Sequence, residues 1–241
     1  MPEHHELAFI EPLIDQLVLA GSAEYEFPFV TLSYVQSLDG CIAPEGGTGW
    51  LSGSKQVLTL TRYLRSHHDG HLVSVDSLLA DTPGLSERYG AAEETRWVIL
   101  DPELRITPDC NVFAEAAHPP IILTAATAHP DRRALLAGCG AHIIPIYTSS
   151  GGDIDIRPVL AALANTGIRT LMVEGDGHLI STLLQQNLVN YCVITIAPRF
   201  TGGLKTIEGS SAADAAPLTI TDCQYQPLGA DIIAFGPVRY G

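Results

Sequence analysis

Short apolar runs and amphipathic segments alternate along most of the chain, and this alternation indicates an α/β fold. Runs rich in β-branched and aromatic residues predict strands, whereas apolar residues three and four positions apart predict helices. The predicted strands are residues 29–35, 71–75, 96–100, 121–124, 142–146, 169–173 and 191–197. The predicted helices are residues 13–19, 54–65, 131–137, 157–165 and 178–186.

Strands that alternate with helices favour a mostly parallel central sheet with helices on both faces. Residues 217–224 and 230–235 follow one another without a helix and predict a C-terminal antiparallel hairpin. Residues 39–53 are rich in Gly and Pro and are expected to form a loop. Because no repeat or linker interrupts the core, we expect one domain at residues 28–241. Residues 1–27 form an N-terminal extension, whose short helix is expected to pack on this domain or on a partner subunit.

The composition narrows the class of protein. An apolar content of 46% with 17% charged residues is typical of a packed core and excludes intrinsic disorder. No apolar stretch approaches the roughly 18 residues of a membrane-spanning helix, and no basic segment precedes an apolar run at the N-terminus. We expect a soluble, cytoplasmic protein with no membrane partner. Five cysteines at irregular spacing, without a CxxC pair, are typical of reduced thiols and not of disulfides or a zinc site.

The charge of the chain excludes one class of partner. Lys and Arg number 13 and Asp and Glu 27, which gives a net charge of −14. Only Lys55 and Lys205 are lysines, and the arginines are scattered along the sequence. A surface that follows the phosphates of nucleic acid needs clustered basic residues, so no nucleic acid is expected as a partner. A small anionic ligand needs a local pocket that overcomes the negative field of the whole chain.

Ligands of a mostly parallel sheet bind where strands end and helices begin, and four such junctions carry polar residues. The first contains Ser37, Asp39 and Cys41, directly after the first strand. Asp39 can orient a substrate hydroxyl or transfer a proton, although Asp-Gly is also common in plain turns. The second contains Ser52 and Ser54 at a helix start, where exposed amides favour a phosphate and where either serine can equally be an N-cap.

The third junction contains His67 and His71, which are spaced like two metal ligands on a helix. Asp69 and Gly70 are expected to end the helix between them, so the pattern favours a structural polar role, and no metal is predicted. The fourth junction, residues 173–179, is a Gly-rich turn from strand to helix, which is the usual shape of a phosphate cradle. Glycine also simply permits such turns, and a carboxylate at Asp176 is expected to repel an anion there.

Several short segments, taken in order, resemble one known family. They are residues 29–34, 37–39, 63–65, 67–70, 79–81, 83–85, 173–175 and 194–198. The family is that of the riboflavin-biosynthesis reductases, the RibD C-terminal-domain family, and the resemblance is greatest to its single-domain members from fungi and archaea. It covers residues 28–236 and implies a dihydrofolate-reductase-like fold.

Members of this family use NADPH to reduce the ribosyl group of a diaminopyrimidinone ribosylamino 5′-phosphate to a ribityl chain, and they are usually homodimers. The resemblance therefore implies a small-molecule substrate, NADPH as cofactor and a homodimer. By position, Asp39 is the implied catalytic residue, beside the substrate sugar. The implied substrate-binding residues are Ser37, Cys41, Ser52, Ser54, Leu85 and Arg88. The implied cofactor-binding residues are Ser74, Asp76, Ser77, Asp81, Glu174, Gly175, Asp176, Gly177 and His178.

The chain departs from the family pattern at three places. Cys41 stands where many members have a basic residue, Asp76 stands in what is usually a Gly-x-Gly-Thr run, and Asp176 replaces the second glycine of a Glu-Gly-Gly turn. The carboxylates of Asp76 and Asp176 are expected to repel the diphosphate of a cofactor. Two alternatives therefore stay open. One is a repurposed enzyme that isomerises or cyclises its substrate without NADPH, and the other is a binding partner without catalytic activity.

Overall fold

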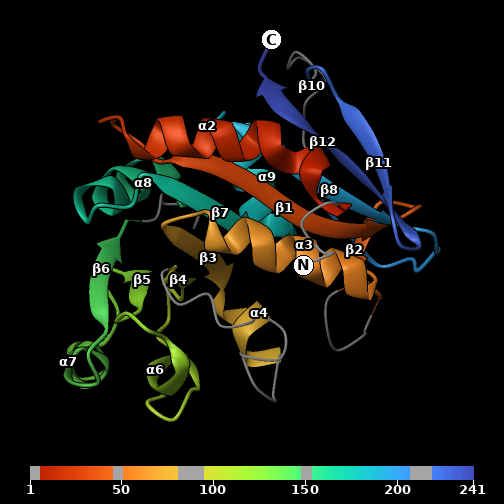
Figure 1. Cartoon of the computed structure of the whole chain (residues 1–241). Coiled ribbons are helices and arrows are strands. Elements are labelled where there is room, and N and C mark those ends of the chain that lie inside the picture. Colours follow the sequence, from red (N-terminus) through yellow and green to blue (C-terminus); the bar gives the residue numbers. More distant parts are fainter. Residues whose placement is uncertain (1–5, 46–50, 81–94, 148–153, 207–218) are drawn as a thin grey trace.

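Helices and strands alternate along the chain in the order that the apolar pattern predicts. The computed structural model describes residues 6–45, 51–80, 95–147, 154–206 and 219–241, which Figure 1 shows as a coloured ribbon. In chain order the elements are η1 (Ala8–Ile10), α2 (Glu11–Gly21), β1 (Phe29–Ser37), β2 (Cys41–Ala43), α3 (Lys55–Ser66), β3 (Gly70–Ser74), α4 (Val75–Ala80), β4 (Arg96–Leu100), α6 (Val112–Glu115), β5 (Ile121–Ala125), α7 (Pro130–Gly138), β6 (His142–Ile146), α8 (Ile156–Asn165), β7 (Thr170–Glu174), α9 (Gly177–Gln185), β8 (Tyr191–Ala197), β9 (Leu204–Lys205), β10 (Thr219–Ile220), β11 (Gln224–Leu228) and β12 (Asp231–Arg239).

The main sheet has parallel strands in its middle and an antiparallel hairpin at one edge, so the predicted fold class is confirmed. In the described residues its strand order is β10-β12-β8-β1-β7-β3-β4-β5-β6, and β11 also pairs with β12. All neighbours from β8 to β6 run parallel, whereas β12 runs antiparallel to β8, β10 and β11. β7 follows β3 in the sequence but lies between β1 and β3, so the order of the strands reverses there. Open parallel sheets bind ligands at the carboxyl ends of strands beside such a reversal.

Helices cover both faces of this sheet, as the sequence predicts. Side chains alternate between the faces along each strand, so neighbouring residues of β7 contact different helices. Leu171 and Val173 belong to a core with α8 and α9, whereas Met172 between them belongs to a core with α2 and α3. A third core lies where α4, α6 and α7 cover β3, β4 and β5. In Figure 1 the terminal hairpin of β11 and β12 stands at the side of the molecule opposite β6.

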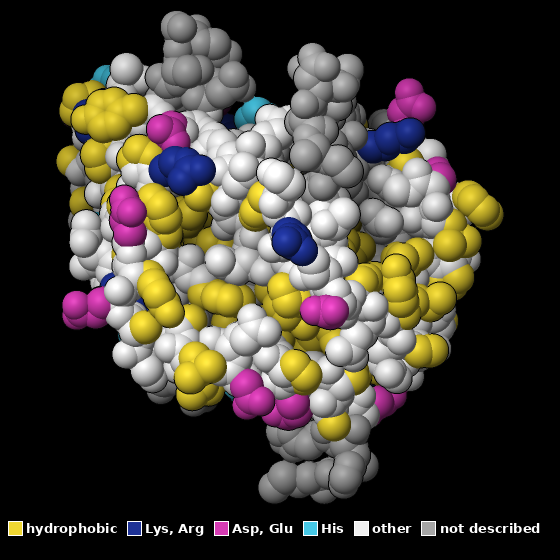
Figure 2. Space-filling model, turned by 90° about the horizontal axis from the view of Figure 1, so that it is seen from above, with side chains coloured by type: hydrophobic (Ala, Val, Ile, Leu, Met, Phe, Trp, Pro, Cys, Tyr) yellow, Lys and Arg dark blue, Asp and Glu magenta, His cyan; other side chains and the backbone are white. Residues whose placement is uncertain are grey.

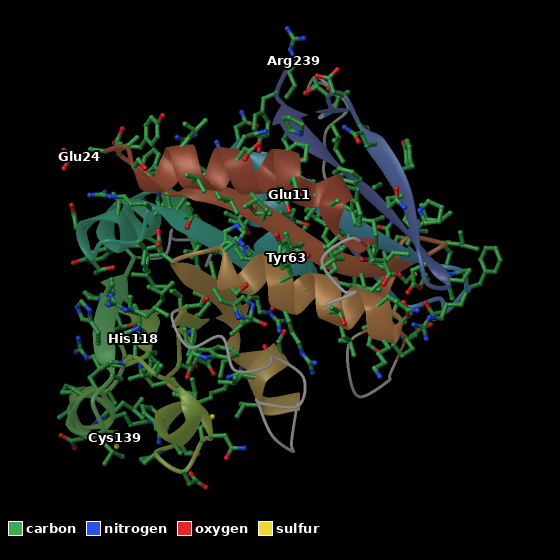
Figure 3. All side chains as sticks on the ribbon, viewed as in Figure 1. Glu11, Glu24, Tyr63, His118, Cys139 and Arg239 are labelled. Carbon is green, nitrogen blue, oxygen red and sulfur yellow. The ribbon has the colours of Figure 1, made fainter. Side chains whose placement is uncertain are left out.

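The helix of the N-terminal extension packs on its own domain. Leu17 of α2 is buried in the same core as Phe235 of β12, and the rings of Phe9 and Phe235 lie 5.2 Å apart. Alongside α3, Glu11 Oε1 accepts a hydrogen bond from the Tyr63 hydroxyl over 3.2 Å, and Figure 3 labels both residues on their helices. Of the two expectations for this helix, packing on the domain is confirmed.

Two predicted elements differ from the structure. Residues 41–43 lie inside the expected loop but form β2, because they pair with β9, a partner far along the chain that a local pattern does not reveal. The first strand of the terminal hairpin is β11 and not residues 217–224, so that prediction is wrong in position. β11 contains Pro227, which edge strands tolerate, and Gly229, with a φ of 62°, forms the tight turn to β12.

The surface carries separated charges. Figure 2 shows one face on which the Lys and Arg side chains stand apart from one another, and Asp and Glu side chains are scattered over the same face. On the part of this face that is drawn in colour, the basic side chains form no continuous patch. None of the described helices is long and apolar enough to cross a membrane. In the same residues, no group of three or more His, Cys, Asp or Glu side chains is arranged to hold a metal ion.

The burial of α2 predicts that residue 17 matters for stability and that residue 18 does not. Leu17 is 3% exposed, whereas its neighbour Val18 is 64% exposed. We expect Leu17→Ala to lower the free energy of unfolding by about 2–5 kcal/mol, because it leaves a cavity in the core. Val18→Ala is the matched control, with an expected change below about 0.5 kcal/mol. Urea unfolding followed by circular dichroism measures both, and equal effects would show that α2 does not pack on the domain in this way.

Candidate functional site

A pocket opens between α3 and the carboxyl halves of the central strands. Residues of β1, β7 and β8 line it on one side, and residues of α3 and the segment before it line the other. The lining residues are Ser33, Tyr34, Val35, Ile42, Leu51, Ser52, Gly53, Val57, Leu58, Thr61, Arg65, Ser77, Glu174, Gly175 and Thr195. The pocket thus lies beside the reversal of strand order, where a ligand of this kind of sheet is expected.

The predicted site residues divide into three groups. Those that line the pocket are Ser52, Ser77, Glu174 and Gly175. Those that lie at the same end of the strands, but not on the pocket lining, are Ser37, Asp39, Cys41, Ser54, Ser74, Asp76, Asp176, Gly177 and His178. Asp81, Leu85 and Arg88 lie outside the described residues.

Asp39 holds the turn after β1 to the loop after β8. Its carboxylate accepts hydrogen bonds from Ser37 Oγ over 2.5 Å and from the amides of Thr201 and Gly202 over 3.2 and 2.8 Å. These hydrogen bonds, above all that from Ser37, hold the pKa of Asp39 far below its usual value. An ionised carboxylate with both oxygens engaged fixes a loop or attracts a cation, and it is a poor proton donor. The role of Asp39 beside the substrate stays a prediction.

Cys41 is buried next to this carboxylate, with its Sγ 3.5 Å from Asp39 Oδ2. Burial, and then the hydrogen bond and charge of Asp39, raise the pKa of the Cys41 thiol, so the thiol is protonated at neutral pH. Lys205, one of the two lysines, is its partner across the ladder of β2 and β9. A buried, protonated thiol is a poor nucleophile, and the substrate-binding role of Cys41 stays a prediction.

The carboxylate of Asp231, from the terminal hairpin, caps the N-terminus of α3. Ser54 occupies the N-cap position, but its side chain makes no capping hydrogen bond, so the predicted serine cap is wrong. Instead, the buried Asp231 accepts a hydrogen bond from Ser54 N over 2.6 Å and opposes the helix dipole. Gly229 permits this contact, because a Cβ there would lie 2.9 Å from Ser54 Oγ. Ser52, whose carbonyl accepts a hydrogen bond from Arg199, is the serine of this segment that lines the pocket.

β3 leads directly into α4, and two buried serines join them. Ser74 Oγ and Ser77 Oγ are 3.0 Å apart, and Ser77 N donates to Ser74 Oγ over 3.3 Å. Asp76 between them points to the surface, where its Oδ1 lies 2.7 Å from Arg105 Nη2. The expectation that Asp76 repels an anion therefore needs a correction, because a guanidinium group compensates this carboxylate.

The start of α9 contains its own cap. Asp176 Oδ1 accepts a hydrogen bond from Leu179 N over 2.9 Å. Gly177 is required by a close approach, because a Cβ there would lie 2.8 Å from the carbonyl oxygen of Lys205. The amides of Gly177 and His178 have no hydrogen-bond partner among the described residues. They are the donors that this helix start offers to a ligand.

Glu174, the last residue of β7, belongs to a buried polar cluster at the pocket. Its Oε2 accepts hydrogen bonds from Arg65 Nη2 of α3 and from His71 Nε2 of β3, the latter over 2.9 Å. Burial by itself raises the pKa of Glu174, but the charge of Arg65 and the hydrogen bonds from Arg65 and His71 outweigh it and hold the pKa well below its usual value. Glu174 is therefore a fixed negative charge beside the pocket.

No local motif assigns a site role to Arg65, although a signal is present. Arg65 is buried and lies on the face of α3 that also carries Val57 and Thr61, and a buried arginine needs a partner. The structural role favoured for His71 is confirmed, because its Nε2 contacts Glu174. No local sequence pattern identifies Glu174 as the partner of Arg65 and His71.

His68 completes this polar layer between α3 and the sheet. Its Nδ1 lies 2.7 Å from the Leu64 carbonyl oxygen, and its Nε2 lies 2.8 Å from Thr31 Oγ1. Burial lowers the pKa of His68 to about 4, so the ring is neutral at neutral pH.

The neutral His68 predicts a loss of stability as the pH falls. The unfolded chain takes up this proton near pH 6.5 and the folded chain only near pH 4, so the unfolded state binds more protons between these values. By itself this group lowers the free energy of unfolding by about 2 kcal/mol between pH 7 and pH 5. We expect His68→Gln to flatten this part of the pH profile, measured by urea unfolding, and His142→Gln on the exposed edge of β6 to leave it unchanged. An equal slope in His68→Gln and the parent protein would contradict the assignment.

The chain has clear relatives. Residues 28–234 match the family model of the RibD C-terminal domain. The chain is 34% identical to the 2,5-diamino-6-ribosylamino-4(3H)-pyrimidinone 5′-phosphate reductase of Debaryomyces hansenii over 193 residues, which are 73% of this chain and 76% of that protein. It is 33% identical to the protein of the same name from Saccharomyces cerevisiae over 201 residues, 78% of this chain and 79% of that one. The solved structure of the riboflavin biosynthesis reductase Rib7 from Saccharomyces cerevisiae aligns with a TM-score of 0.72 and 26% identity, covering 96% of this chain and 99% of that chain.

Proposed function

The chain belongs to the RibD C-terminal domain family, and from this we propose that it reduces 2,5-diamino-6-ribosylamino-4(3H)-pyrimidinone 5′-phosphate to the ribitylamino form with NADPH. The similarity to named reductases identifies the chain as an oxidoreductase: two relatives are 34% and 33% identical over 73% and 78% of the chain. The homodimer, the cytoplasmic location and the roles of Asp81, Leu85 and Arg88 stay predictions.

One observation carries the proposal. Ser52, Ser77, Glu174 and Gly175 are implied as substrate-binding or cofactor-binding residues by the family resemblance, and all four line one pocket. They come from segments that are far apart in the sequence, and the pocket lies where an open parallel sheet binds ligands. This convergence supports one site that takes both substrate and cofactor.

The residues at the pocket fit a nucleotide cofactor. Ser77 lines the pocket, and its hydroxyl pairs with that of Ser74. The amides of Gly177 and His178 lie off the pocket lining, at the start of α9, where free donors favour a phosphate. With Glu174 and Gly175, these residues would hold NADPH. The negative charge of Asp76 is compensated by Arg105. One carboxylate oxygen of Asp176 accepts a hydrogen bond from the Leu179 amide, and neither carboxylate excludes the cofactor.

The proposed reaction adds a hydride, which NADPH supplies when it is bound, to C1′ of the ribosyl group and a proton to its ring oxygen. The bond between C1′ and the ring oxygen breaks, and an open ribityl chain with a new hydroxyl results. Glu174 places a fixed negative charge beside the pocket, and such a charge favours the positive charge that develops at C1′ and the amine nitrogen as the ring opens.

The other lining residues suit a sugar substrate. Ser52, Thr195 and Tyr34 bring polar groups to the pocket, and burial raises the pKa of Tyr34, which keeps its hydroxyl protonated as a donor. Ile42 and Val57 add apolar contacts that displace water from the reacting carbon.

The proposal predicts that the protein oxidises NADPH when the ribosylamino substrate is added, with one cofactor consumed per ribityl product. We expect Ser77→Ala to raise the KM for NADPH about tenfold, because one hydrogen bond to the cofactor is lost. Ser66→Ala, which removes an exposed hydroxyl that contacts the Tyr63 carbonyl, is the control and should leave the KM unchanged. Absorbance of NADPH measures the rate.

The outcomes separate the alternatives. Absence of turnover by the parent protein at saturating substrate, together with normal NADPH binding, would overturn the assigned substrate. Absence of NADPH binding in calorimetry would overturn the reductase proposal and favour the repurposed enzyme or the non-catalytic binding partner.

The charge of Asp176 gives a second test. Asp176→Asn removes the charge and keeps the helix cap, because Asn and Asp are equally good N-caps. Since an anion at the start of α9 is repelled by this carboxylate, we expect the variant to bind NADPH about fivefold more tightly. Asp131→Asn makes the same change of charge at the start of α7 and should not alter the affinity. Equal affinities of both variants and the parent would show that the cofactor does not approach the start of α9.

A further inference from the structure

The two carboxylate oxygens of Glu174 have different surroundings. Oε2 accepts hydrogen bonds from Arg65 Nη2 and His71 Nε2, whereas Oε1 has no hydrogen-bond partner among the described residues. The Glu174 side chain is 20% exposed and lines the pocket, while those of Arg65 and His71 are 5% and 2% exposed. Glu174 thus lines the pocket with one carboxylate oxygen, Oε1, that accepts no hydrogen bond from the described residues.

We propose that Arg65 and His71 are positioning residues that keep Glu174 ionised and turn its Oε1 toward a hydroxyl or N–H donor of the bound ligand. This inference rests on the proposed function, since the donor belongs either to NADPH or to the ribosyl substrate. It adds to that function two residues that act through Glu174.

The charges of the cluster support this role. Arg65 carries a full positive charge that balances the carboxylate, so the buried pair is neutral as a whole. Burial, and then the nearby Arg65, lower the pKa of His71, so its ring is neutral and its Nε2 reaches Oε2 as an N–H donor. Among the described residues, the titratable groups that act on Glu174 are Arg65 and His71, and the charge of His71 in turn acts on His68.

The positions of both donors are themselves held by neighbours. The His71 ring packs against the Trp97 ring of β4 with centroids 5.1 Å apart. The Arg65 carbonyl accepts a hydrogen bond from Thr95 Oγ1 over 2.7 Å, which joins the end of α3 to the start of β4. α3, β3 and β4 thus fix the orientation of the Glu174 carboxylate. An acceptor that is oriented before the ligand binds loses less conformational entropy on binding.

The test measures the ionisation of Glu174 without any ligand. Protein labelled with ¹³C-glutamate is titrated by NMR, and the Glu174 carboxyl resonance is assigned by its absence in Glu174→Gln. We expect the parent resonance to stay ionised down to the lowest pH at which the protein is folded. We expect His71→Leu, which removes the donor, to titrate at least about one pH unit higher. His71→Gln can donate from its amide and should restore the parent behaviour.

A second measurement identifies the ligand donor. NADPH and the ribosylamino substrate are added separately to the labelled parent protein. A shift of the Glu174 resonance with NADPH alone assigns the donor to the cofactor, and a shift only with the substrate assigns it to the substrate. For the ligand that causes the shift, we expect His71→Leu to weaken binding about tenfold and His71→Gln to stay within about twofold of the parent.

The result that overturns the proposal is a Glu174 titration that is the same in His71→Leu and in the parent, or a Glu174 resonance that neither ligand moves although both bind. Circular dichroism verifies that each variant is folded, and Arg65→Lys, which keeps the charge but changes the donor geometry, is the second variant if His71→Leu does not fold. Failure of the proposed function is distinguishable, since it appears as absent binding or turnover of the parent while the titration without ligand still tests the cluster.

Discussion

The buried contact between Arg65 and Glu174 is the interaction on which the site depends. It joins α3 to the end of β7, and β7 is the strand at which the order of the sheet reverses. α3 supplies one side of the pocket and the sheet the other, so this ion pair connects the two sides. A buried arginine or glutamate alone is costly, and each group therefore requires the other to be in place. His71 adds a neutral donor to the same oxygen, and the pocket receives a carboxylate with one free acceptor.

Many acidic residues have a structural role in this fold, and this role accounts for part of the net charge of −14. Among the described residues, six aspartates accept hydrogen bonds from backbone amides at turns and helix starts: Asp39, Asp69, Asp101, Asp155, Asp176 and Asp231. Such contacts satisfy buried donors and oppose helix dipoles. The acidity of the chain is thus partly a set of structural anchors, and a group of them surrounds the carboxyl ends of the strands.

The apolar pattern predicted most of the helices and strands, because each of these elements buries a face of its own and needs no distant partner to be recognised. The pattern failed at β2 and β11, since a three-residue strand and a strand that contains Pro227 form only through pairing with other strands. The candidate site divides in the same way. The family resemblance implies Ser77, Glu174 and Gly175 as site residues, and all three line the pocket. It implies no role for Arg65, whose partner Glu174 is far along the chain.

By itself, the sequence determined the α/β class, the parallel core with its terminal hairpin, and the family. Periodicity and the residues at strand-to-helix junctions are local properties, and they can be identified in the sequence without the tertiary structure. The tertiary structure alone decided that Asp231 and not a serine side chain closes α3, that Arg105 compensates Asp76, and that Arg65 and His71 hold Glu174. These are hydrogen bonds and ion pairs between groups far apart in the chain, and their energies depend on distance and burial, which exist only once the chain has folded.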